Sequence, residues 1–317
     1  MALTFHKMHS LGNDFVVVDA ISQNVHLQPA QIRWLGDRHR GIGFDQLLLI
    51  EPPTDPEADF TFRIYNADGS EAQQCGNGTR AAALLVNRLG LSRKKTIVWQ
   101  SLAGSFSTEF TDPSQIETTM TVPVLSLAKI PFDDSAAQPA QNEFEFRQFT
   151  LSSTVGDFVV TPVSMGNPHA VTLVDDVQAT DVPGIGAALT EHPAYPERAN
   201  VGFCQVVDEQ FVRLRVFERG TGETLACGSG ACAAVVATTS LGLTRGKVKV
   251  SLPGGKLRIH WPGPGERVIM AGDANLVFSS DVTIPGGLPA DTADAADEGD
   301  NSDTDPSSTN NATQDHN

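Results

Sequence analysis

Two short turns in this sequence place a cysteine and two glycines directly before an apolar, alanine-rich stretch. Residues 75–81 read CGNGTRA and residues 227–233 read CGSGACA, and the two cysteines lie 152 positions apart (227 − 75). A cysteine at the start of a helix lies beside unpaired backbone N–H groups that carry partial positive charge. Such a position lowers the pKa of a thiol and favours the basic, nucleophilic thiolate. The glycines keep the backbone open, so that its N–H groups can converge on a carboxylate.

A thiolate and a thiol on opposite sides of one carbon centre are suited to inverting its stereochemistry. The thiolate removes a proton from one face, and the thiol delivers a different proton to the other face. A cysteine base suits this reaction because its pKa can be tuned close to the working pH. Cys75 and Cys227 would then share one proton and titrate as a coupled pair, and the reaction would need no cofactor.

The similarity between the two halves extends upstream of the turns. Residues 62–81 read FRIYNADGSEAQQCGNGTRA, and residues 214–233 read LRVFERGTGETLACGSGACA. With the cysteines aligned, Asn66 matches Glu218. The aligned block is therefore about twenty residues long, which indicates a duplicated unit rather than a repeated turn.

Two further pairs of segments match in the same order along the chain. GNDFVVVD at residues 12–19 resembles GNPHAVTLVD at residues 166–175, and GFDQ at residues 43–46 resembles GFCQ at residues 202–205. The period is far too long for a solenoid. We therefore expect two copies of one domain that face each other about a pseudo-twofold axis, with a small ligand bound between them.

The local patterns predict an α+β chain with many strands. Apolar runs bounded by turn residues predict strands at residues 15–18, 46–50, 60–65, 96–99, 159–163, 170–174, 211–217 and 248–252. Helices are expected at residues 29–38, 80–89, 185–190 and 231–241. Residues 125–141 contain two prolines and are predicted to link the halves.

Composition limits the classes of protein that this chain can belong to. Its 317 residues are 40% hydrophobic, which is enough for two domains with cores of their own. No run of 18 apolar residues predicts a membrane span. The N-terminus has no apolar segment of the kind found in signal peptides, and we expect a cytoplasmic protein.

The negative charge is concentrated at the C-terminus. Residues 285–317 hold eight acidic residues and no lysine or arginine, and they are predicted to form a disordered tail. Without the tail, 22 basic residues face 30 acidic residues (38 − 8), which leaves a charge of −8. This balance argues against a nucleic-acid partner.

Other interpretations of the cysteines and glycines fit less well. Cys204 lies in a strand-like segment and Cys232 lies inside a predicted helix, so both are expected to be core residues. Cys227 and Cys232 are spaced as C-x₄-C, but no second close pair of ligands completes a zinc site, and we expect no metal. Both turns read G-x-G-x-x-A, but no strand leads directly into either one, as a dinucleotide fingerprint requires.

Taken together, the motifs resemble the diaminopimelate epimerase family. The resemblance runs in family order over about residues 1–278, through FHKMHSLGNDFVVVD, GIGFDQ, YNADGSEAQQCGNGTR, MGNPHAV, ERANVGF and FERGTGETLACGSGACA. It implies interconversion of LL- and meso-2,6-diaminopimelate without pyridoxal phosphate, in the biosynthesis of lysine and of peptidoglycan precursors. It also implies two pseudo-symmetric domains, each a β-sheet or barrel around a central α-helix, with the active site in the cleft between them.

The resemblance also divides the chain and implies a homodimer. The N-terminal domain would span residues 1–123, the C-terminal domain residues 124–267, and a return strand at about residues 268–284 would rejoin the first domain. The tail, residues 285–317, lies outside the family pattern. Val277 and Phe278 stand where the family often has Val-Tyr, whose tyrosine contributes to the dimer interface. A phenylalanine ring can still pack there.

Matched position by position, the resemblance assigns roles to individual residues. Cys75 and Cys227 would be the catalytic acid and base, and Glu218 and His169 would tune their pKa values. Arg219 would bind the distal carboxylate, since a guanidinium can do so through two parallel hydrogen bonds. Substrate contacts are assigned to Asn13, Gln46, Asn66, Gly76, Asn77, Asn167, Asn200, Glu218, Arg219, Gly228 and Ser229, with the backbone N–H groups of Gly76, Asn77, Gly228 and Ser229 holding the reacting carboxylate.

Alternatives remain open at this point. Without the resemblance, Glu218 is equally well a cleft-wall residue and His169 a histidine at a strand start. Another two-cysteine enzyme, such as one like proline racemase, fits the cysteines, but Arg219 and the asparagines favour a substrate with two amino-acid ends. Isomerases of the phenazine-pathway type do not need both cysteines. A non-catalytic amino-acid-binding relative would be free to lose Glu218 or a cysteine, and all three are present.

Overall fold

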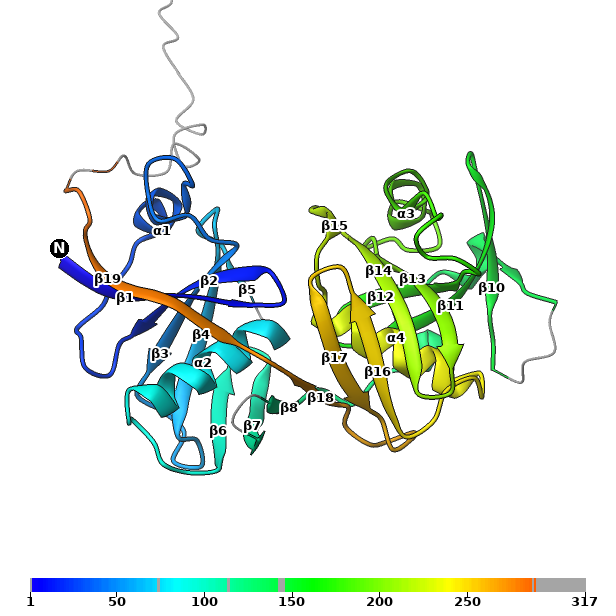
Figure 1. Ribbon diagram of the computed structural model, residues 1–317. Helices are drawn as coiled ribbons and strands as arrows, with labels where there is room; N and C mark the ends of the chain where they lie inside the picture. The colour runs from blue at the N-terminus through cyan, green and yellow to red at the C-terminus, as the bar shows by residue number, and fades with distance from the viewer. Residues whose placement is uncertain (1, 73–74, 113–114, 142–145, 287, 289–317) are drawn as a thin grey trace, which may run out of the picture.

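Each half of the protein wraps a sheet around one central helix, as the computed structural model in Figure 1 shows. The structure describes residues 2–72, 75–112, 115–141, 146–286 and 288. The first half contains β1 (Ala2–Ser10), β2 (Asn13–Asp19), α1 (Pro29–Gly36), β3 (Gln46–Glu51), β4 (Phe60–Asn66), β5 (Glu71–Ala72), α2 (Gly76–Arg88), β6 (Thr96–Ser101), β7 (Gly104–Asp112) and β8 (Gln115–Thr119).

The second half begins with two additional strands, β9 (Gln138–Pro139) and β10 (Phe149–Ser153), and then follows the same order of elements. From there it contains β11 (Gly156–Ser164), β12 (Pro168–Leu173), α3 (Val182–Thr190), β13 (Asn200–Asp208), β14 (Phe211–Glu218), β15 (Gly222–Thr224), α4 (Gly228–Ser240), β16 (Lys247–Leu252), β17 (Gly255–His260) and β18 (Ile269–Gly272). The last strand, β19 (Asn275–Thr283), crosses back and pairs antiparallel with β1, completing the sheet of the first half (Figure 1). Between the halves, the predicted linker contains only short 3₁₀ turns and β9.

The strand pairings confirm the expected duplication. β2 and β3 are parallel, as are β12 and β13, and each following pair, β3–β4 and β13–β14, is antiparallel. Phe15 pairs with Gln46 and His169 pairs with Asn200, so both pairs are related by an offset of 154 (169 − 15 and 200 − 46). The register therefore identifies Asn200 as the counterpart of Gln46.

This register overturns one match made from the sequence, that of GFDQ with GFCQ. Gln46 is the first residue of β3, whereas Gln205 lies well inside β13, whose first residue is Asn200. Gly43 precedes its strand with a φ of 73°, a conformation that favours glycine. Gly202 lies within β13, so the two glycines serve different local structures. The letters match by chance, and only strand pairing gives the true equivalence.

The pseudo-twofold axis passes between β8 and β18, which pair antiparallel at the junction of the halves (Figure 1). Thr118 and Met270 are equivalent positions, because their offset of 152 (270 − 118) equals that of the two cysteines, and they pair with each other. Helices α2 and α4 contact each other near this axis. The fold thereby brings the two cysteine turns, at the N-terminal ends of these helices, to one place.

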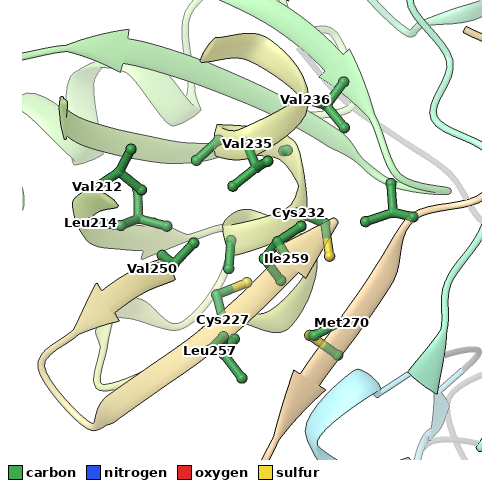
Figure 2. Close-up of a cluster of buried hydrophobic side chains, with 14 of the residues drawn as sticks. Val212, Leu214, Cys227, Cys232, Val235, Val236, Val250, Leu257, Ile259 and Met270 are labelled. Carbon is green, nitrogen blue, oxygen red and sulfur yellow. The ribbon is translucent and has the colours of Figure 1, made fainter. Parts of the chain in front are cut away.

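The described residues form four hydrophobic cores, two in each half. Helices α2 and α4 each lie at the centre of one core, and α4 is apolar almost all round, as a helix enclosed by its sheet should be. Figure 2 shows the α4 core, with Val235 and Val236 of the helix among side chains from β14, β16 and β17. The other two cores lie beneath α1 and α3.

Two other expectations concern membrane spans and the C-terminal tail. Among the described residues, no helix is long and apolar enough to cross a membrane. Most of the predicted disordered tail, residue 287 and residues 289–317, lies outside the described residues.

Candidate active site

A cleft of about 1660 Å³ lies between the halves and is lined by both cysteine turns. Cys75, Gly76 and Asn77 reach it from the first half, and Cys227 and Gly228 reach it from the second. The structure therefore brings together the two segments that are 152 positions apart in the chain (227 − 75). A ligand in the cleft would meet a thiol from either side.

Cys75 is the N-cap of α2, as the position of its turn predicts. Its Sγ accepts a hydrogen bond from the backbone N–H of Gly78 at 3.2 Å, and it lies 3.9 Å from Oδ1 of Asn13. A Cβ at Gly78 would lie 3.3 Å from this sulfur and 3.1 Å from Leu48. The glycine therefore lets the helix start close to the thiol. An N–H that points at sulfur stabilises the thiolate form.

Cys227 is the N-cap of α4 but has a different partner. Its Sγ donates to Oε2 of Glu218 at 3.1 Å, and it lies 3.6 Å from Oγ of Ser229. The other oxygen of Glu218 accepts a 2.6 Å hydrogen bond from Thr224. Glu218 is thus held by a second residue, and its carboxylate serves as the acceptor for the thiol. This arrangement stabilises the protonated form of Cys227.

Both thiols have raised pKa values, so the prediction of a lowered pKa is wrong. Burial raises the pKa of Cys75 to about 11, although the N–H of Gly78 and the charge of Arg80 act in the opposite direction. Burial also raises the pKa of Cys227 well above its usual value, and the negative charge of Glu218 adds to this effect. The helix N-terminus favours the thiolate in each case, but the loss of hydration outweighs it.

The backbone of the two turns offers a site for a carboxylate. A helix provides no acceptor for its first N–H groups, which here are those of Gly76 and Asn77 in α2 and of Gly228 and Ser229 in α4. All four residues line the cleft. A Cβ at Gly76 would lie 2.6 Å from Cε of Met270, so a side chain here would displace the end of that methionine. The geometry suits an anion held between two helix N-termini.

The predicted polar residues of the first half form two hydrogen-bonded pairs. The side chain of Gln46 donates to Oδ1 of Asn66 at 3.1 Å across β3 and β4. Asn13 donates to Asp45 at 2.9 Å and accepts from Asn77 at 3.5 Å. Asn13, Gln46, Asn66 and Asn77 all line the cleft.

In the second half the predicted residues divide between the cleft and the layer behind it. Asn167 and Arg219 line the cleft. Asn200 is buried, and its Oδ1 accepts from the backbone N–H of Arg219 at 3.0 Å. His169 is also buried, and its Nε2 lies 3.1 Å from Oδ1 of Asn167. Asn200 and His169 therefore reach the cleft only through the residues that they hold.

His169 is held neutral by its surroundings. Burial lowers its pKa to about 3, and the positive charge of Arg219 contributes in the same direction. A neutral imidazole with one ring nitrogen beside Asn167 can orient that amide. Arg219 itself is exposed, and its Nη1 donates to the carbonyl oxygen of Glu197 at 3.0 Å.

Several residues that hold the site were not predicted from the sequence. Arg80 lies one turn into α2 and is fully buried, Thr224 holds Glu218, and Asp45 holds Asn13. One signal for Arg80 was available in the sequence. Arg80 directly precedes AAALLV, in the helix that is expected to fill the core. An arginine in such a helix is buried, and a buried charged group needs hydrogen-bond partners.

Among the described residues, no cluster of three or more His, Cys, Asp or Glu side chains could hold a metal ion. The side chains that line the cleft include the two thiols, several amides, the carboxylate of Glu218 beside a thiol, and the exposed guanidinium groups of Arg38, Arg219 and Arg267. They offer proton transfer and recognition of carboxylate and amino groups.

Two pseudo-symmetric halves, each with a central helix that begins at a cysteine in a shared cleft, define an isomerase fold of the racemase and epimerase type. The chain belongs to the diaminopimelate epimerase family, whose model matches residues 5–125 and 161–277. It is 48% identical, over 287 residues, to a diaminopimelate epimerase from Aromatoleum aromaticum (strain DSM 19018 / LMG 30748 / EbN1). That match covers 90% of this chain and 100% of the relative.

Solved structures with the same fold are more distant in sequence. A probable proline racemase from Agrobacterium radiobacter K84 superposes with a TM-score of 0.65 at 15% identity, covering 90% of this chain and 94% of that one. A phenazine biosynthesis protein of the PhzF family from Bacillus anthracis gives 0.62 at 16%, covering 90% and 100%. At this identity the likeness concerns the fold alone. The fold is thus common to the two enzyme alternatives weighed from the sequence, and the family match distinguishes this chain from those two.

Proposed function

We propose that this protein interconverts LL- and meso-2,6-diaminopimelate by a two-base mechanism, in the biosynthesis of lysine and of peptidoglycan precursors. One observation carries the proposal: Cys75 and Cys227 cap equivalent helices and line one cleft from opposite halves. The membership of the family supports the choice of substrate. No cofactor enters this scheme.

The reaction follows from the chemistry of the two turns. One cysteine, as thiolate, removes the α-hydrogen of the substrate as a proton, and the electron pair left behind spreads into the α-carboxylate. The N–H groups of Gly76, Asn77, Gly228 and Ser229 stabilise the charge that develops on that carboxylate. The other cysteine, as thiol, delivers its proton to the opposite face. A raised thiol pKa makes each thiolate a stronger base once it is formed.

The far end of the substrate would meet the polar residues around the turns. Arg219 is suited to the distal carboxylate, and Asn66 and Asn167 can both donate and accept, as an amino-acid end requires. His169 would act behind Asn167, and Asn200 behind Arg219, since these are their hydrogen-bond partners. We assign Glu218 to hold the proton on Cys227 between turnovers.

The assembly of the chain forms part of the same proposal. We divide it into an N-terminal domain of residues 1–123 joined by the return segment 268–284, and a C-terminal domain of residues 124–267. We further propose a cytoplasmic homodimer formed through β19, where Val277 and Phe278 are 58% and 47% exposed. The ring of Phe278 already packs edge-on against Phe5 at 5.9 Å between centroids. Sedimentation velocity of the wild type and of Phe278→Asp tests the dimer.

The decisive experiment uses purified, reduced protein and LL-diaminopimelate in D₂O, with no pyridoxal phosphate added. We expect meso product that carries solvent deuterium at the inverted α-carbon, because the delivered proton comes from a thiol that exchanges with solvent. L-Proline and L-glutamate, run in parallel, should give no exchange. If folded protein with titratable thiols forms no meso product, or if L-proline exchanges instead, the proposed substrate is wrong.

A further inference from the structure

A buried arginine lies beside the Cys75 turn and has no counterpart in the other half. Arg80 is fully buried, and its position 152 residues later (80 + 152) is occupied by Cys232. Both residues lie five positions after their respective catalytic cysteines. The two helices therefore have equivalent backbones but differ in charge at this position. The proposed proton transfer gives this charge difference no role.

The guanidinium of Arg80 ties the start of α2 to two other segments. It donates to the carbonyl oxygen of Gly76 at 3.1 Å and to Oδ1 of Asn77 at 2.6 Å, within the turn that carries Cys75. It also donates to Oγ of Ser10 at 2.7 Å on β1 and to the carbonyl oxygen of Asp273 at 3.2 Å, between β18 and β19. Gly76 and Asn77 are thereby fixed in place.

None of these four acceptors carries a negative charge. Among the described residues, no carboxylate lies within salt-bridge distance of Arg80. The ionisable groups that face it are Cys75 from the N-cap of α2, Asp273 from the β18–β19 connection and Cys232 from α4. Burial lowers the pKa of Arg80 to about 10, and of the three facing groups Cys75 opposes this most strongly. A buried cation without an ion-pair partner is costly, and ionisation of Cys75 would compensate for it.

A second substitution between the halves works in the same direction. Glu218, which accepts the hydrogen of Cys227, has Asn66 as its counterpart (218 − 66 = 152). At these two equivalent positions the first half thus has a cation and a neutral amide, whereas the second half has a neutral thiol and a carboxylate. The charge of Glu218 raises the pKa of both cysteines, but at Cys75 the larger effect of Arg80 opposes it. Opposite charges at equivalent positions favour the thiolate at Cys75 and the thiol at Cys227.

We propose that Arg80 is a positioning residue that fixes the Gly76–Asn77 turn and, as the counter-ion of the Cys75 thiolate, decides which of the two cysteines gives up the shared proton. This inference rests on the proposed function, because it gives a direction to the two-base mechanism. It does not rest on turnover, since the ionisation of each thiol can be measured directly. Gly272 contributes to the site by leaving room, because a Cβ there would lie 3.1 Å from Nε of Arg80.

The test measures alkylation of each cysteine by iodoacetamide as a function of pH, read by peptide mass spectrometry on the full-length protein. Arg80→Met removes the charge, Arg80→Lys keeps it, and the exposed Arg88→Met on the same helix is the matched control. We expect Arg80→Met to move the alkylation midpoint of Cys75 upward by at least about one pH unit, a tenfold loss of thiolate at a given pH. Cys227 should move by less than about a third of that, and Arg80→Lys should restore most of the shift at Cys75.

Several outcomes would overturn the assignment. They are an unchanged Cys75 midpoint in folded Arg80→Met, an equal shift in Arg80→Lys, and an equal shift at Cys227. If Arg80→Met does not fold, the Glu218→Gln protein decides, because Arg80 remains while the carboxylate is gone. In Glu218→Gln the alkylation midpoint of Cys75 must still lie at a lower pH than that of Cys227. The reverse order would overturn the proposal. A protein that passes these tests but does not turn over diaminopimelate would refute the proposed function and leave the role of Arg80 intact.

Discussion

The Sγ of Cys227 lies 3.1 Å from Oε2 of Glu218, and the thiol is the donor. This hydrogen bond holds a proton on Cys227, although both cysteines occupy the same N-cap position of equivalent helices. The sulfur of Cys75 instead accepts a hydrogen bond from a backbone N–H. The two thiols therefore have different electrostatic surroundings, which is what a reaction with one acid and one base requires.

Replacing Glu218 with Gln should make Cys227 easier to ionise. Burial is the main cause of the raised pKa of Cys227, and the charge of Glu218 is the next. Removing that charge lowers the pKa, so the alkylation midpoint of Cys227 should fall, and epimerase activity should drop at least about tenfold as the proton balance is lost. The matched control is Glu209→Gln, whose carboxylate is exposed and pairs with Arg245. An unaltered Cys227 midpoint would show that the carboxylate does not hold the proton.

Alanine at Cys75 or at Cys227 should each abolish epimerisation while the fold is retained. Each residue would be the only proton donor or acceptor on its face, and such a group typically contributes about 10²–10⁴ in rate. The other two cysteines, Cys204 and Cys232, are fully buried in the α4 core and provide controls. We expect Cys204→Ala and Cys232→Ala to keep activity within about threefold, since neither lines the cleft. Meso product formed by Cys75→Ala or Cys227→Ala at the wild-type rate would disprove the two-base assignment.

The central elements of the fold could be predicted because their patterns are local. The helices expected at residues 80–89 and 231–241 appear as α2 and α4, which begin earlier, at Gly76 and Gly228, directly after the cysteines at their N-cap positions. Strands of mostly polar sequence, such as β7 and β19, gave no such signal. They become strands because a neighbour supplies the hydrogen-bonding edge, β6 for one and β1 for the other.

The site shows the same division between local and distant information. The sequence and the family resemblance named the two cysteines and several of the residues that line the cleft with them, and also His169 and Asn200, which lie behind it. The sign predicted from the sequence for the thiol pKa change was wrong, because burial between two halves depends on contacts far apart in the chain. The sequence and the resemblance also missed Arg80, whose acceptors Ser10 and Asp273 lie 70 and 193 positions away. These partners can be identified only from the folded structure, in which β1 and the β18–β19 connection pack against α2.

His169 should make the stability of the protein depend on pH. Burial lowers its pKa from 6.5 to about 3, so the folded protein binds no proton there at pH 5 while the unfolded chain does. The unfolded state then binds more protons, and stability falls as pH drops below 6.5, by up to about 1.4 kcal/mol per pH unit for this residue. Above pH 6.5 the contribution is fully present.

The check is the free energy of unfolding by urea at pH 7.5 and at pH 5.0. His169→Asn should reduce the loss between these two values by roughly 1–2 kcal/mol, because asparagine does not titrate. His39→Asn, whose side chain is 95% exposed, should leave the loss as in the wild type. An equal pH dependence in wild type and His169→Asn would mean that His169 is protonated in the folded protein.

Leu11 joins the two halves by an unusual contact. It lies in the turn between β1 and β2 of the first half, yet its side chain is 6% exposed and belongs to the α4 core of the second half. Its φ is 57°, a left-handed conformation that is strained for leucine. The turn between β16 and β17 receives it closely, since a Cβ at Gly254 would lie 1.9 Å from the carbonyl oxygen of Leu11. The counterpart of Gly254 in the first half is Leu102 (254 − 102 = 152), which is 64% exposed, so this docking occurs on one side only.

The burial and the backbone strain of Leu11 together predict how substitutions at this position rank in free energy of unfolding. Leu11→Ala should lower the free energy of unfolding by about 2–4 kcal/mol, as expected for a buried leucine. Leu11→Gly removes the same packing but relieves the left-handed strain, so it should be about 1 kcal/mol more stable than Leu11→Ala. Leu102→Ala, at the exposed equivalent turn, should change stability by less than about 0.5 kcal/mol. Urea unfolding of the four proteins measures all three differences.

Two results would contradict this prediction. A Leu11→Ala protein as stable as the wild type would show that the turn does not hold the halves together. A Leu11→Gly protein less stable than Leu11→Ala would show that the left-handed backbone carries no strain.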